Sequence, residues 1–151
     1  MMDSDLRSEK AVAYFKKGYN CAQSVVLAYG DLLEMEEETL AKLASSFGGG
    51  MGRLREVCGS VSGMFMAYGM LKGYSQPEDT EGKKKQYKTV QEMASAFSKC
   101  HGSIICRDIL KKQAGPDDFI PDERTETYYI SRPCEKCVAD AAKILENFLR
   151  K

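Results

Sequence analysis

The stretch Gly18-Tyr19-Asn20-Cys21-Ala22-Gln23-Ser24-Val25-Val26-Leu27-Ala28-Tyr29-Gly30 decides the fold class. Glycines stand at both ends, and the apolar residues between them lack the alternation typical of a strand. Asn20 and Gln23 occupy the two positions of a reciprocal helix cap. We therefore predict a helix that begins after Asn20 and ends at Gly30.

Apolar stripes bounded by glycine recur on both sides of this stretch. They predict further helices over 4–17, 39–47, 58–73 and 83–102, a short helix capped by Ser103, and a last helix beginning at Pro133. The segment 74–82 is predicted to be an exposed loop. No internal repeat or linker interrupts the chain. The prediction is an all-α fold, a compact single-domain bundle of about six to seven helices spanning residues 1–151.

The composition excludes several classes of function. The 22 basic and 22 acidic residues balance, so we expect no binding to nucleic acid. The polar first residues do not resemble a secretion signal, and the longest apolar run, 61–71, is too short to cross a bilayer. We expect a cytoplasmic protein with no membrane insertion.

Six cysteines in a chain of 151 residues need an explanation. Cys21, Cys58, Cys106 and Cys134 all fall in the first turns of different predicted helices. Backbone N–H groups at a helix N-terminus stabilise an anion, so a thiol placed there has a lowered pKa. A thiolate is both a nucleophile and a metal ligand, and these four are the candidate catalytic and metal-binding residues. The alternative is that cysteines only fill the core, and for Cys100 and Cys137 we favour structural or accessory roles.

Other candidate residues carry weaker signals. Cys134-Glu135-Lys136-Cys137 is a C-x-x-C motif, but no βαβ pattern surrounds it and no histidine follows, as haem attachment would require. His101, the single histidine, is expected to be exposed near a helix end. The glycine-rich run 48–52 is expected to form a tight turn that brings backbone close to Cys58. Arg53 and Arg55 follow this run and could support a thiolate.

These segments, in this order, resemble the C_GCAxxG_C_C family of redox-active proteins. Cys58-Gly59-Ser60-Val61-Ser62-Gly63 is similar to its signature, with Ser60 in place of alanine. The stretches 18–23, 47–52 and 102–110, and Cys134 with the residues after it, match its other segments over about residues 10–148. The resemblance implies a redox role for Cys21, Cys58, Cys106 and Cys134. It also implies that a transporter is encoded by a neighbouring gene. By analogy with similar domains of multi-centre cytochromes, it implies an iron–sulfur cluster.

Three interpretations follow. We favour a redox protein that uses the four cysteines as bare thiolates or as ligands of an iron–sulfur cluster, with an electron-transfer or transporter partner. The second is a non-catalytic carrier of zinc or copper. The third is a helical interaction module whose cysteines only pack, and a homo-oligomer is compatible with each.

Cys58 is expected to be the most nucleophilic or the most exposed of the four cysteines. Gly59 and Gly63 are expected beside a bound cofactor. The alternative is that these two glycines, four residues apart, let their helix pack closely against a neighbour.

Overall fold

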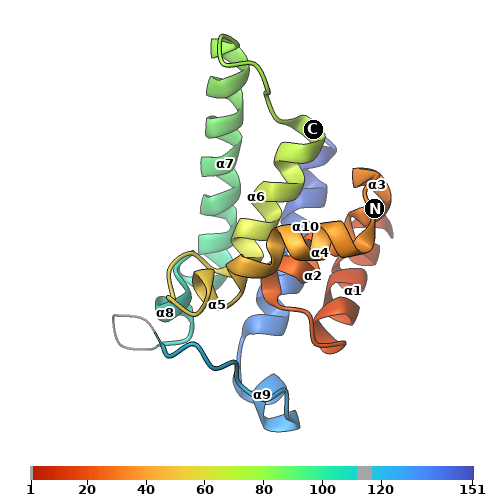
Figure 1. Cartoon of the computed structure of the whole chain (residues 1–151). Helices are drawn as coiled ribbons and strands as arrows, with labels where there is room; N and C mark the ends of the chain where they lie inside the picture. The colour runs from red at the N-terminus through yellow and green to blue at the C-terminus, as the bar shows by residue number, and fades with distance from the viewer. Residues whose placement is uncertain (1, 112–116) are drawn as a thin grey trace.

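The computed structural model describes residues 2–111 and 117–151, and within its first helix the side chains from Leu6 onward. The elements are α1 (Met2–Lys16), α2 (Cys21–Ala28), α3 (Gly30–Leu33), α4 (Glu37–Ala44), the 3₁₀ turn η1 (Ser45–Phe47), α5 (Gly48–Met51), α6 (Gly59–Lys72), α7 (Thr80–His101), α8 (Cys106–Ile109), α9 (Glu126–Ser131) and α10 (Cys134–Leu149), shown in Figure 1. Over this part of the chain no strand forms beyond one isolated bridge, and six helices have eight or more residues. The predicted all-α fold is therefore confirmed.

The apolar helix α2 lies at the centre of the molecule. It packs against α1, α4, α6 and α10, and its residues from Ser24 to Ala28 are buried (Figure 1). The predicted cap is present: the Gln23 N–H donates to Asn20 Oδ1 at 2.8 Å, and the Asn20 N–H donates to Gln23 Oε1 at 3.0 Å. Burying such a helix on all sides removes apolar surface from water, and this stabilises the fold by about 25 cal/mol for each Å² of apolar surface buried.

A buried arginine, paired with an exposed aspartate, fastens the N-terminal helix to this core. Arg7 of α1 is 9% exposed and donates to the Ala28 carbonyl at 2.8 Å and to Asp31 at 2.6 Å. Its guanidinium also lies 4.9 Å from the ring centre of Tyr29, whose hydroxyl donates to the Ala142 carbonyl on α10. The C-terminal helix thus completes the core.

Several predicted helix boundaries are wrong by a few residues. Helix α7 begins at Thr80 because Asp79 caps it, accepting a hydrogen bond from the Gly82 N–H at 2.9 Å. Ser103 is not the cap of α8: its hydroxyl accepts a hydrogen bond from the Ile105 N–H, and Ile105 is the cap residue. The short helix α9 was not predicted. None of the described helices is long and apolar enough to span a bilayer.

Candidate functional site

A short stretch of paired backbone brings two distant cysteines together. The Cys58 N–H donates to the Ile104 carbonyl at 2.8 Å, and the Cys106 N–H donates to the Glu56 carbonyl at 2.6 Å. Between them Val57 and Ile105 form an isolated antiparallel bridge. The segments that lead into α6 and α8 are therefore held side by side, which places Cys58 and Cys106 at one end of the bundle.

The glycine-rich run takes a conformation that side chains would obstruct. Gly50 has a φ of +70°, and a Cβ atom on it would lie 2.6 Å from the Cβ atom of Cys106. The backbone of this turn therefore approaches Cys106. Gly49 of the same turn lines one cavity with Cys58, and a close approach of the backbone to Cys58 stays a prediction. Arg53 and Arg55, just beyond, also have φ near +60°, a costly conformation for residues that carry a Cβ.

Five of the six cysteines line one small cavity of about 60 Å³, roughly the space of a few water molecules. They are the four predicted ones and Cys137, together with Asn20, Gly49, Arg55, Gly59, Ile109, Leu110, Arg124, Tyr128 and Arg132. A more open cleft of about 270 Å³ adjoins it, because Arg55, Arg124, Tyr128 and Arg132 line both. A separate cleft of about 400 Å³ along α1 and α4 contains no cysteine.

Cys58 is the cap residue of α6 and is 6% exposed. Its thiolate accepts a hydrogen bond from the Cys137 thiol, which is the largest influence on it, and others from the N–H groups of Ser60 and Val61. Burial opposes these bonds, yet together they lower the pKa of Cys58 to about 7. The buried Ser60 hydroxyl also helps to lower this pKa, and its oxygen has no hydrogen-bond partner within the described residues.

A second pair of thiols joins the first residues of α2 and α10. The Cys21 thiol donates a hydrogen bond to Cys134, which lowers the pKa of Cys134 and raises that of Cys21 well above its ordinary value. Both residues are half-buried, whereas Cys58 is buried. The prediction that Cys58 is the most exposed of the four is therefore wrong. Its pKa is lowered, as is that of Cys134.

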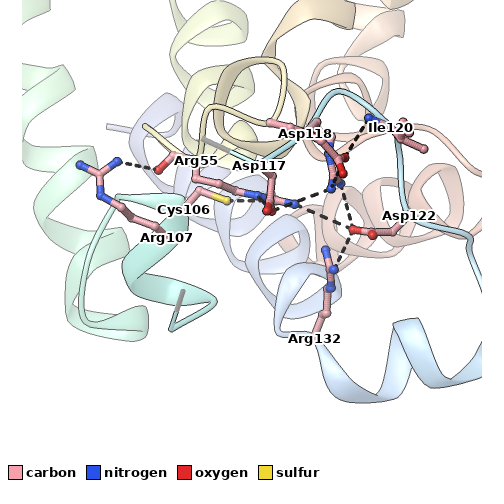
Figure 2. Close-up of polar contacts among 9 residues, drawn as sticks. Arg55, Cys106, Arg107, Asp117, Asp118, Ile120, Asp122 and Arg132 are labelled. Carbon is pink, nitrogen blue, oxygen red and sulfur yellow. Dashed lines mark hydrogen bonds and ion pairs between the residues drawn. The ribbon is translucent and has the colours of Figure 1, made fainter. Parts of the chain in front are cut away.

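Cys106 has a charged partner instead of a thiol (Figure 2). Burial raises its pKa, while Arg55, whose Nη1 lies 3.5 Å from the sulfur, opposes that rise. Arg55 is 3% exposed and also donates to Asp117 at 2.8 Å. Arg53 contacts Asp122 at 2.9 Å, and Arg132 contacts the same carboxylate at 2.7 Å. Arg55 thus supports Cys106, whereas Arg53 pairs with the acidic residues Asp117, Asp118 and Asp122.

Gly59 and Gly63 lie where α6 crosses α2. A Cβ atom on Gly59 would lie 2.9 Å from the Phe47 carbonyl oxygen, and one on Gly63 would lie 2.7 Å from the Ala22 carbonyl oxygen. Both glycines are thus needed for close packing of the two helices. Gly59 also lines the cysteine cavity, so a role beside a cofactor stays a prediction for it.

The thiols do not form the shell of a metal site. Over residues 2–111 and 117–151, no three His, Cys, Asp or Glu side chains are grouped so that they could hold one metal ion. The hydrogen bonds described above arrange four thiols as two pairs, with Cys106 held by Arg55. The thiols as they lie here are not arranged to hold an iron–sulfur cluster or zinc. Ligation by the four cysteines would need them to rearrange, and it stays a prediction.

Two residues of this region were assigned minor roles from sequence. Cys137 was expected to be structural, but it lines the cavity and contacts Cys58. His101 was expected to be exposed, but its side chain is 8% exposed and hydrogen-bonds to Asp140 at 2.9 Å. The C-x-x-C spacing was the signal that could have drawn attention to Cys137. Cys100 is exposed and does not line the cavity.

Comparison with known proteins agrees with the segments described above. A family model described as "Putative redox-active protein (C_GCAxxG_C_C)" matches residues 19–148. The match includes every cysteine of the cavity. No curated protein and no solved structure matches the chain.

Proposed function

The chain belongs to the C_GCAxxG_C_C family of redox-active proteins, and from this membership we propose that it is a thiol–disulfide redox protein with Cys58 as its nucleophile. The observation that carries the proposal is the environment of Cys58 at the N-terminus of α6. The Cys137 thiol, which lines the same cavity, and the N–H groups of Ser60 and Val61 all lower the pKa of its thiol. A thiolate is the reactive form of cysteine, and a pKa of about 7 leaves roughly half of Cys58 ionised at neutral pH.

The proposed reaction is attack of this thiolate on a disulfide. A bond forms between the Cys58 sulfur and one sulfur of the substrate, the substrate's S–S bond breaks, and its second sulfur leaves as a thiolate. The optimum attacking thiol has a pKa near the ambient pH, because a lower pKa makes the thiolate a weaker nucleophile. The value for Cys58 is close to this optimum.

The arrangement of the two cavities supports an approach of the substrate disulfide from the side of the open cleft. The small cavity around the thiols holds little more than a few atoms, whereas the adjoining cleft of about 270 Å³ is open and is bordered by Phe119, Pro121 and four arginines. The cleft would accept the body of a substrate or a partner's loop, while a single sulfur reaches the cysteines. The half-buried Cys21 and Cys134 stand at the same cavity and would form a second redox pair.

Alkylation with mapping tests the proposal. Fully reduced protein, treated briefly with iodoacetamide at neutral pH and digested, should carry label on Cys58 well before Cys137. The exposed Cys100 serves as an internal standard for an ordinary thiol. Labelling of Cys137 ahead of Cys58 would contradict the assignment. Iron, sulfide and zinc analysis of anaerobically purified protein belongs with this experiment, because a bound metal would protect Cys58 and would instead favour ligation.

A further inference from the structure

Cys137 lies one turn after Cys134 on α10 and is 1% exposed. Its thiol lies between the Cys58 sulfur and the imidazole of His101. On one side it donates a hydrogen bond to Cys58. On the other, its sulfur lies 3.7 Å from Nδ1 of His101.

His101 is held firmly in this position. It is the last residue of α7, which Gly102 ends in the left-handed conformation, and its ring stacks on Phe97 with 4.6 Å between ring centres. Its Nε2 atom lies 2.9 Å from a carboxylate oxygen of Asp140, whose other oxygen contacts Lys136 at 3.2 Å. The imidazole is therefore fixed at both of its nitrogen atoms.

The identity of these contacts sets the tautomer of the ring. An ionised carboxylate only accepts hydrogen bonds, so Nε2 of His101 carries the hydrogen that is donated to Asp140. In the neutral ring Nδ1 then presents a lone pair, and the Cys137 thiol faces it. Asp140 follows Cys137 by three residues on α10, so both contact the ring from the same face of that helix.

We propose that Cys137 is the resolving thiol for Cys58, and that His101, positioned by Asp140, is the base that removes its proton. The inference rests on the proposed function, since it describes the step that follows attack by Cys58. It assigns a reaction to Cys137, the sixth cysteine of the chain, and to its single histidine.

The order of the two steps follows from the negative charge on the Cys58 thiolate. While Cys58 is a thiolate, Cys137 stays protonated, because its hydrogen bond to that thiolate and its burial raise the pKa of Cys137 well above the ordinary range. Once Cys58 has formed a mixed disulfide, its negative charge is gone and it no longer accepts that hydrogen bond. The Cys137 proton then passes to Nδ1 of His101, which leaves a nucleophilic thiolate next to the mixed disulfide.

The second step balances as an exchange. The Cys137 sulfur bonds to the Cys58 sulfur, the bond between Cys58 and the substrate sulfur breaks, and that sulfur leaves as a thiolate that takes up a proton. Over both steps the two cysteines lose two electrons and form a disulfide. The substrate disulfide gains two electrons and becomes two thiols.

Rapid mixing of the reduced full-length chain with one equivalent of 5,5′-dithiobis(2-nitrobenzoate) separates the steps. Cys100→Ser is the background for every variant, since that exposed thiol would react on its own. Release of the first coloured thiolate reports attack by Cys58, and release of the second reports resolution by Cys137. Acid quenching and peptide mapping identify the mixed disulfide and the final Cys58–Cys137 disulfide.

His101→Gln keeps a donor for Asp140 but has no basic nitrogen. We expect an unchanged first release and a second release slowed by roughly 10²-fold, in the range for loss of a general base. Asp140→Asn should slow the second release less, and Cys137→Ser should abolish it and trap the mixed disulfide on Cys58. The urea midpoint of each variant shows that it is folded.

Each contrary outcome has one meaning. A second release in His101→Gln as fast as in the parent, or equal slowing of both releases, would overturn the role of His101. A final disulfide that joins Cys58 to another cysteine would overturn the role of Cys137. In either case a first release at Cys58 would leave the proposed function intact, whereas its absence in the parent would refute that function.

Discussion

Replacing Cys137 by alanine isolates the largest influence on the nucleophile. The hydrogen bond from Cys137 is the main cause of the lowered pKa of Cys58, which is about 7. A hydrogen bond to a charged group contributes about 1.5–3 kcal/mol, and one pKa unit corresponds to about 1.4 kcal/mol. We therefore expect the pKa of Cys58 to rise by about one to two units in Cys137→Ala.

The sign of the effect on rate depends on pH. Below the midpoint, alkylation of Cys58 in Cys137→Ala should be slower by roughly 3- to 10-fold, because fewer thiols are ionised. On the alkaline plateau it should be faster by about the same factor, since a more basic thiolate is a better nucleophile with a Brønsted coefficient of about 0.5. The two pH profiles should therefore cross.

The assay is iodoacetamide labelling across a pH series, with the rate at Cys58 taken from peptide mapping. Cys137→Ser is the matched control, because its hydroxyl can still donate a hydrogen bond and should keep the midpoint closer to that of the parent. A midpoint that stays at about 7 in Cys137→Ala would refute the reasoning. It would show that the N–H groups at the start of α6 are sufficient to stabilise the Cys58 thiolate.

Four further substitutions test the packing and capping of the site and the stabilisation of the Cys58 thiolate. Gly63→Ala should destabilise the fold by about 1–3 kcal/mol in urea unfolding, because the new Cβ would lie 2.7 Å from a carbonyl oxygen of α2. Gly69→Ala, on the same helix but 3.4 Å from a flexible side chain, should cost nothing or stabilise by up to about 1 kcal/mol, and equal effects would contradict this account. Asn20→Ala removes the cap of α2 and should cost about 1 kcal/mol in the same assay, so an unchanged midpoint would argue against the cap. Ser60→Ala should raise the pKa of Cys58 by less than Cys137→Ala does in the labelling series, because Ser60 is a weaker influence on that thiolate, and a larger shift would reverse that order.

Much of the fold could be predicted because its signals are local. The capping pair Asn20 and Gln23 involves residues of a single turn, and Gly102 ends α7 through its own backbone conformation. Such features depend on a few neighbouring residues, so they can be recognised in one sequence. The placement of four cysteines at helix starts is of the same kind: Cys21, Cys106 and Cys134 are first residues, and Cys58 is a cap.

The partners of each thiol were decided by the tertiary structure. The bridge between Val57 and Ile105 turns Cys106 toward Arg55, and the packing of α10 against α6 and α7 brings Cys137 between Cys58 and His101. These residues are far apart along the chain, and no local pattern states which thiol will face a donor, a cation or an imidazole. The sequence by itself determined the helices and the cysteines that begin them. Only the packed bundle determined which thiol is ionised, because a pKa depends on the burial and the charges that distant segments supply.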